Sequence, residues 1–171
     1  MLMFCLFPGA VCFGLDPTVI TVRKSRMTYG VGVVNRFDPA RHPDSKRIQK
    51  DGNDWCAGIF DTFVASGQPV TLGDKVIRRY APANRDQKTS IIHVYCSESS
   101  DVQYVTDPGV QRCATMRLDL VDAEVEIGVE PSTTRREIEA TMTFGDTEIR
   151  VSARDATTGC NVGSTIDFLQ K

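Results

Sequence analysis

Histidine and serine are the side chains of this sequence that come nearest to catalytic chemistry. His93 could act as a general base, and Ser90 lies close to it in the apolar run 90–96. No nucleophile motif surrounds either residue, so a histidine and a serine with satisfied hydrogen bonds inside a strand are the simpler interpretation. His42 lies in a proline-containing basic segment and is expected to be solvated. We therefore expect that the chain is not an enzyme.

Phosphate chemistry lacks its usual motifs. Gly30 and Gly32 have the G-x-G spacing, but the third glycine and the helix of a dinucleotide site do not follow. No glycine-rich turn ends in Lys-Ser or Lys-Thr, as a P-loop requires. No cofactor is therefore expected in this chain.

The cysteines do not favour metal or disulfide chemistry. No two of them have the C-x-x-C spacing, and only two histidines are present as further ligands, so no metal site is expected. Cys96 belongs to an apolar strand pattern, in which a free thiol behaves as a small hydrophobic side chain. Reduced thiols and a cytoplasmic location are expected on these grounds. The six cysteines are Cys5, Cys12, Cys56, Cys96, Cys113 and Cys160.

The acidic residues gather at turns and in one run. Asp107 precedes a Pro-Gly pair, and Asp146 and Asp155 also have turn-forming neighbours. Their side chains are expected to accept hydrogen bonds from nearby backbone. The run 122–130 holds four acidic residues and no basic one, which is typical of a solvated loop or an exposed strand edge.

Alternation of apolar and polar residues predicts the strands of the second half. The pattern has a period of two at 116–120, 138–144, 149–154 and 162–168, with turn residues between the last three runs. The run 90–96 is apolar on both faces, as in a central strand. These strands predict an all-β protein built as an antiparallel two-sheet β-sandwich.

The first half predicts shorter extended segments on either side of a long loop. The polar stretch 35–54 is interrupted by prolines and a glycine and predicts that loop. Residues 55–64 fit either a short helix or an edge strand. The extended segments are 18–22, 29–34, 70–72 and 76–80.

The composition of the 171 residues permits one sizeable core, because 41% of them are hydrophobic. A formal charge of −2 argues against nucleic acid as a partner, and no apolar run has the roughly 18 residues that span a membrane. Residues 1–15 carry no charge and suggest a secretory or lipoprotein leader, but no basic region precedes them and Pro8-Gly9 interrupts them. We favour the remnant of a buried helix.

Several short segments occur in the same order in one known family. They are 25–33 (SRMTYGVGV), 107–110 (DPGV) and 144–149 (FGDTEI). Together they resemble the C-terminal part of the divergent heat shock 70 kDa protein 12 family. Residues 9–17 are similar to the end of that family's actin-like ATPase domain. Residues 92–95 and 149–159 are similar to strands of the ordinary heat shock 70 kDa substrate-binding domain.

The resemblance implies a particular organisation of the chain. Residues 1–17 would be a helical remnant of the ATPase domain, and 18–171 an eight-stranded substrate-binding-like sandwich with an insertion at about 35–54. The family's ATPase motifs would lie upstream, so ATP is expected only for a full-length relative. We expect a truncated or alternatively started product.

The resemblance also implies a non-catalytic, chaperone-like module that grips an extended hydrophobic polypeptide. Carried over position by position, its peptide-contacting residues are Tyr29, Val31, Val34, Tyr80, Ala83, Ser90 and Ile92. Ser90 and the insertion depart from the family pattern. Both favour an alternative, a structural or interaction scaffold without an open groove. Such a scaffold would dock to an ATPase domain in a longer isoform or to another protein.

Overall fold

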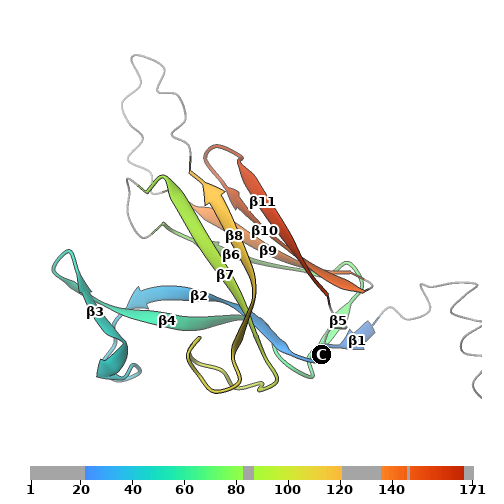
Figure 1. The fold of residues 1–171 in the computed structure, drawn as a ribbon, viewed down its shortest axis with the longest axis horizontal. Coiled ribbons are helices and arrows are strands. Elements are labelled where there is room, and N and C mark those ends of the chain that lie inside the picture. The colour runs from blue at the N-terminus through green and yellow to red at the C-terminus, as the bar shows by residue number, and fades with distance from the viewer. Residues whose placement is uncertain (1–21, 83–86, 121–135, 146, 168–171) are drawn as a thin grey trace, which may run out of the picture.

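A computed structural model describes residues 22–82, 87–120, 136–145 and 147–167. These residues form eleven strands and one short 3-10 helix, η2 (Asp44–Lys46), as Figure 1 shows. The strands are β1 (Val22–Lys24), β2 (Thr28–Arg36), β3 (Arg47–Lys50), β4 (Asn53–Val64), β5 (Pro69–Thr71), β6 (Lys75–Tyr80), β7 (Thr89–Ser97), β8 (Gln111–Asp119), β9 (Ile138–Phe144), β10 (Glu148–Asp155) and β11 (Asn161–Asp167).

Two antiparallel sheets make up the body of the protein. One has the strand order β3-β4-β2-β7-β8 and the other β11-β10-β9-β6, while β1 and β5 form a separate two-stranded ribbon. The predicted all-β antiparallel sandwich is confirmed. The described residues hold more strands than the eight that the resemblance implied. The expected helical remnant at 1–17 and the acidic run 122–130 lie outside the described residues.

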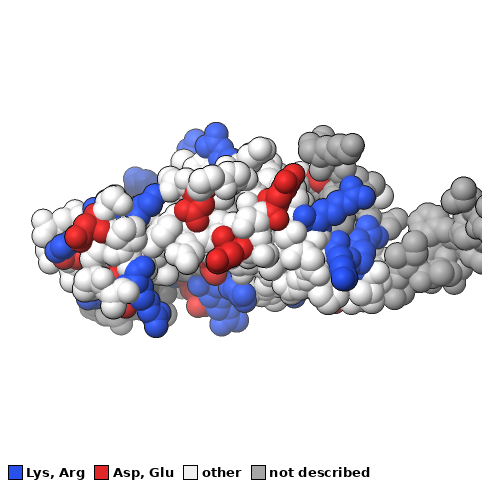
Figure 2. Space-filling model, turned by 90° about the horizontal axis from the view of Figure 1, so that it is seen from below, with Lys and Arg blue, Asp and Glu red and all other residues white. Residues whose placement is uncertain are grey.

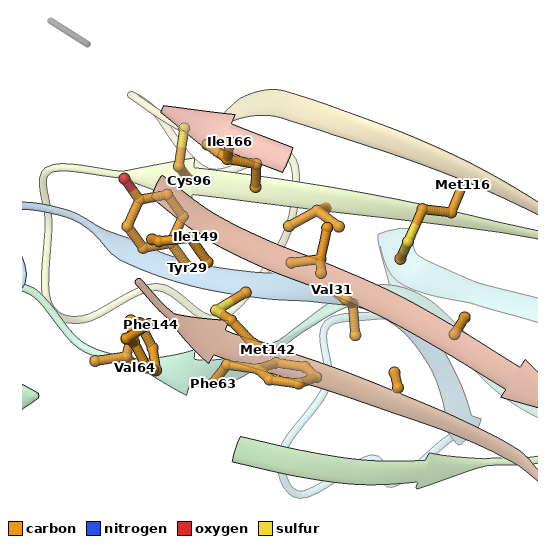
Figure 3. Packing of buried hydrophobic residues seen from close by; sticks show 14 of the residues in the cluster. Tyr29, Val31, Phe63, Val64, Cys96, Met116, Met142, Phe144, Ile149 and Ile166 are labelled. Carbon is orange, nitrogen blue, oxygen red and sulfur yellow. The ribbon is translucent and has the colours of Figure 1, made fainter. Parts of the chain in front are cut away.

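The core lies between the two sheets because alternate side chains of each strand point inward. Ile138, Met142 and Phe144 of β9 and Ile149 of β10 are almost completely buried. Figure 3 shows side chains of β9 and β10 meeting those of the facing sheet, among them Val31. The predicted alternation in β8 to β11 is therefore confirmed, and it follows directly from one buried face on each strand.

Residues 55–64 form a strand and not a helix. They belong to β4, which lies between β3 and β2. The prediction of an edge strand is therefore wrong at residues 55–56, where β3 also pairs with β4. Two register shifts interrupt the pairing of β4 with β2, one between Tyr29 and Gly30 and one between Val33 and Asn35. Such bulges disturb the period-two pattern, which explains why this sequence resembles a helical face.

The predicted loop at 35–54 contains regular structure. β2 continues to Arg36, and β3 pairs with the start of β4 around a turn at Asp51 and Gly52, both of which have positive φ. This hairpin extends away from the sandwich (Figure 1). β3 is an edge strand without a buried residue, so a hydrophobicity pattern does not reveal it.

The surface of the described residues carries mixed charge. Figure 2 shows acidic and basic side chains interspersed over most of the face seen from below. This agrees with the small formal charge of the sequence, −2. No helix among the described residues has both the length and the apolar character that crossing a membrane requires.

Candidate functional site

β2 and β7 pair over only part of their length. The ladder runs from Thr28 opposite Ser97 to Val31 opposite Val94 and ends there. Both strands nevertheless continue, β2 to Arg36 beside β4 and β7 back to Thr89 beside β8. Figure 1 shows the two strands diverging beyond this point. We call the space between residues 32–36 and 89–93 the β2–β7 opening.

On the edges that face the β2–β7 opening, the two strands have no strand partner among the described residues. An unpaired strand edge presents a row of N–H and C=O groups to whatever approaches it. Gly32 lies at the start of the opening, where a Cβ atom would lie 3.0 Å from the Tyr95 ring and 3.1 Å from the Val105 side chain. A side chain at this position would therefore crowd Tyr95 and Val105.

Apolar side chains flank the opening on both faces of the sheet. Extending the register beyond Val31 and Val94 places Val33 level with Ile92, and both of these pack against the core. On the opposite face, the same register places Val34 level with Ile91, which are 48% and 59% exposed. The opening thus combines strand edges that no strand pairs with and apolar contacts, which suits an extended apolar chain.

A hydrogen bond between the two sheets lies beside the opening. Tyr80 of β6 is half-buried, and its hydroxyl donates to Oδ2 of Asp61, which lies opposite Val31 on β4. Burial and this hydrogen bond raise the pKa of Tyr80 above its usual value. The hydroxyl therefore stays protonated near neutral pH and keeps donating to the carboxylate.

The structure separates the predicted peptide-contacting residues into two groups. Tyr29 and Val31 are each only 3% exposed and belong to the core. Val34 is exposed, and Ser90 and Ile92 are half-buried on β7. The structure brings Val34, Ser90 and Ile92 to the β2–β7 opening and Tyr80 to the hydrogen bond beside it. Ala83 lies outside the described residues.

Sequence reasoning missed three residues of this site. Val33 and Ile91 are each adjacent to a residue that the resemblance implies, and consecutive apolar residues do not reveal which of them faces the core. Only the register of β2 against β7 decides it. No signal in the sequence pointed to Asp61, whose partner Tyr80 is on a different strand.

The ligands that a metal site needs are not gathered anywhere among the described residues. Within them, no group of three or more His, Cys, Asp or Glu side chains is placed to hold a metal ion. His93 is in a strand, and its Nδ1 lies 3.1 Å from the Thr115 hydroxyl across β7 and β8. The predicted interpretation of His93 as a satisfied strand histidine is confirmed.

Comparison with known proteins finds two kinds of similar protein. The fold defines this domain as an antiparallel β-sandwich. No family model matches the chain, but it is 49% identical over 164 residues to heat shock 70 kDa protein 12A of Mus musculus and 47% identical over 167 residues to heat shock 70 kDa protein 12B of Homo sapiens. Each match covers 96% of this chain and 24% of the relative.

The chain is similar over almost its whole length to heat shock 70 kDa proteins 12A and 12B. It spans about a quarter of the length of the curated relatives that it matches. The resemblance predicted from residues 25–33, 107–110 and 144–149 is thereby confirmed.

Proposed function

We propose that this chain is a non-catalytic polypeptide-binding module that captures an extended hydrophobic segment in the β2–β7 opening. One observation carries the proposal: the ladder between β2 and β7 stops at Val31 and Val94 while both strands continue. An extended peptide that enters such an opening gains backbone hydrogen bonds from the strand edges, and its side chains alternate between the two faces.

The side chains at the opening fit this role. Val33 and Ile92 offer a half-buried apolar floor on the core side, and Val34 and Ile91 offer exposed apolar contacts on the other side. Unfolded or extended hydrophobic polypeptides are therefore the proposed partners. The relatives' name, heat shock 70 kDa protein, accords with such a partner. For this chain alone we expect no ATP binding, and we retain a cytoplasmic location as a proposal.

Binding can be tested by fluorescence anisotropy with a labelled leucine-rich heptapeptide. Val34→Asp adds a charge to the exposed side of the opening and should weaken binding at least tenfold, since a desolvated charge beside apolar groups is costly. Ile92→Asp should do the same on the core side. Ile77→Asp is the matched control, because Ile77 is equally exposed at 48% but lies on β6 of the other sheet.

The contribution of the backbone can be tested separately with the peptide. N-methylation at alternate positions removes N–H donors while it preserves the side chains, so binding should fall sharply if the peptide pairs with a strand edge. Equal affinity of the parent, Val34→Asp and Ile92→Asp proteins would contradict the assignment of the opening.

A second candidate is a scaffold domain without an open groove. The burial of Tyr29 and Val31 and the hydrogen bond between Tyr80 and Asp61 favour it, because all three close the core side of the sandwich. This candidate predicts no saturable binding at any peptide concentration in the same assay. Saturable binding that Val34→Asp abolishes would rule it out.

A further inference from the structure

Two cysteines on adjacent strands meet at the opposite end of β7 from the β2–β7 opening. Cys96 lies near the end of β7 and is 8% exposed, and Cys113 lies on β8 and is half-buried. Tyr95 pairs with Arg112 and Val94 with Ala114, so Cys113 is the extra residue of a bulge in β8. In the sequence, Cys96 and Cys113 are 17 positions apart, and no spacing motif relates them.

The bulge brings both thiols to the same face of the sheet. In a regular strand, Cys113 and Ala114 would point to opposite faces. Here both pack against the core cluster that includes Cys96. The Cys113 thiol donates to the carbonyl oxygen of Val94 at 3.5 Å. Cys96 pairs with Gln111, two residues from Cys113, so the two cysteines are diagonal neighbours across the β7–β8 ladder.

A cavity gives small molecules access to this thiol pair. It has a volume of about 840 Å³ and is lined by Cys96 and Cys113 together with the exposed residues Gln111, Arg112 and Thr165. Figure 3 shows Cys96 at the edge of the core beside Tyr29 and Ile166, which line the same cavity. A peroxide or a small thiol therefore has a route to sulfurs that are otherwise largely buried.

The two thiols differ in acidity because their side chains interact. Interaction with Cys113 lowers the pKa of Cys96 to about 7, although burial acts in the opposite direction. The same interaction and burial raise the pKa of Cys113. A thiolate is the attacking species in thiol oxidation, which favours Cys96 as the first to react, although Cys113 is the more exposed of the two.

We propose that Cys96 and Cys113 form a site of reversible oxidation, at which a hydroperoxide such as hydrogen peroxide converts the thiol pair into a disulfide. The Cys96 thiolate attacks one peroxide oxygen, the O–O bond breaks, and the departing hydroxide takes up a proton to give water. The resulting sulfenic acid is attacked by the Cys113 sulfur, which forms the S–S bond and releases a second water.

The overall reaction oxidises two thiols and reduces one hydrogen peroxide to two waters. A dithiol reductant reverses it by exchange. The site does not depend on the proposed peptide binding, since it lies on the part of β7 that is paired with β2. Cys160 is the natural comparison, because it is exposed and lies outside the strands, after β10.

Peptide mapping under non-reducing conditions tests the proposal on the full chain. Trypsin cuts after Lys88, Arg112 and Arg117, so Cys96 and Cys113 fall in separate peptides, 89–112 and 113–117. After brief treatment with hydrogen peroxide and alkylation of remaining thiols, mass spectrometry should find these two peptides joined and 2 Da lighter than their sum. Dithiothreitol should separate them. Cys160→Ser should leave the yield unchanged.

Two variants test the order of attack. Cys113→Ser should allow dimedone to trap a sulfenic acid at Cys96, whereas Cys96→Ser should trap at least fivefold less at Cys113. Equal trapping in the two variants would overturn the role of Cys96. Recovery of both peptides as separate alkylated or sulfinic species from the folded parent protein would overturn the site itself, even if a variant failed to fold.

Discussion

Asp155 is completely buried, and its carboxylate has an ion-pair partner and two hydrogen-bond donors. Its side chain is 0% exposed, and Oδ2 lies 3.5 Å from Nε of Arg136, whose side chain is also largely buried. The carboxylate further accepts hydrogen bonds from the Thr157 backbone at 2.9 Å and the Thr158 hydroxyl at 3.0 Å. This one residue thereby holds the β10–β11 turn and joins it to the segment before β9. The predicted role of Asp155 in a turn is confirmed.

Replacing Asp155 by Ala should lower the free energy of unfolding by about 3 kcal/mol, because a largely buried guanidinium loses its ion pair. Urea unfolding followed by circular dichroism measures the change. The control is Asp44→Ala, since Asp44 is 88% exposed in its ion pair with Arg47, and its loss should cost about 0.5 kcal/mol or less. Similar costs for the two variants would contradict this account.

The predicted site residues show what residue-level reasoning cannot decide. An apolar residue in a strand pattern has the same signature whether it faces a core or a ligand. Tyr29 and Val31 could therefore be placed on the correct strand from sequence, but their almost complete burial could not be predicted. Asp61 and Tyr80 meet across two sheets, so neither local pattern nor spacing relates them.

β2 is the element on which the site depends, and its glycines shape it. At Gly30, a Cβ atom would lie only 2.4 Å from the Asp61 carbonyl oxygen and 2.4 Å from the Phe60 ring. The close approach coincides with the register shift between β2 and β4. A side chain at this position would push the two strands apart.

Gly30→Ala is expected to destabilise the fold by about 2 kcal/mol, because it overpacks against backbone that cannot move aside. The measurement is the thermal midpoint together with the urea midpoint. Gly163→Ala serves as the matched control: Gly163 also lies in a strand, but its nearest contact would be an ordinary 3.5 Å from the Val151 carbonyl. If Gly30→Ala proved as stable as Gly163→Ala, the tight approach would be disproved.

The predictability of each element follows from its burial. β9 begins at Ile138 and ends at Phe144, as the sequence predicted, because one face is buried along its whole length. β4 was misinterpreted, since its bulges break the alternation. The β2–β7 opening was beyond prediction from pattern, because it depends on where a ladder between distant strands stops.

At the scale of the whole molecule, Tyr29 links stability to alkaline pH. Its ring lies in the core between the sheets, and desolvation raises the pKa of its hydroxyl from 10 to about 12. The unfolded chain loses this proton at lower pH than the folded chain. Stability from this group is therefore complete below pH 10 and is lost as the pH rises towards 12.

Urea unfolding at pH 8 and at pH 11 should show this loss in the parent protein, by an amount of the order of 1 to 2 kcal/mol beyond that of Tyr29→Phe. The phenylalanine variant keeps the ring in the core but has no hydroxyl to ionise. The comparison cancels the titration of lysines and of other tyrosines. An identical pH dependence in both proteins would contradict a raised pKa at Tyr29.

The two-stranded ribbon of β1 and β5 is the attachment that a pulling force at Val22 would load first. In the part of the chain that the structure describes, Val22 to Lys24 pair with Pro69 to Thr71, and a backbone hydrogen bond from Ser25 to Gln68 continues the attachment. A pull applied at Val22 is borne first by this short attachment and only afterwards by β2. Extension would detach three residues before it disturbed the packed interior, so a mechanical load on this side is absorbed at the periphery.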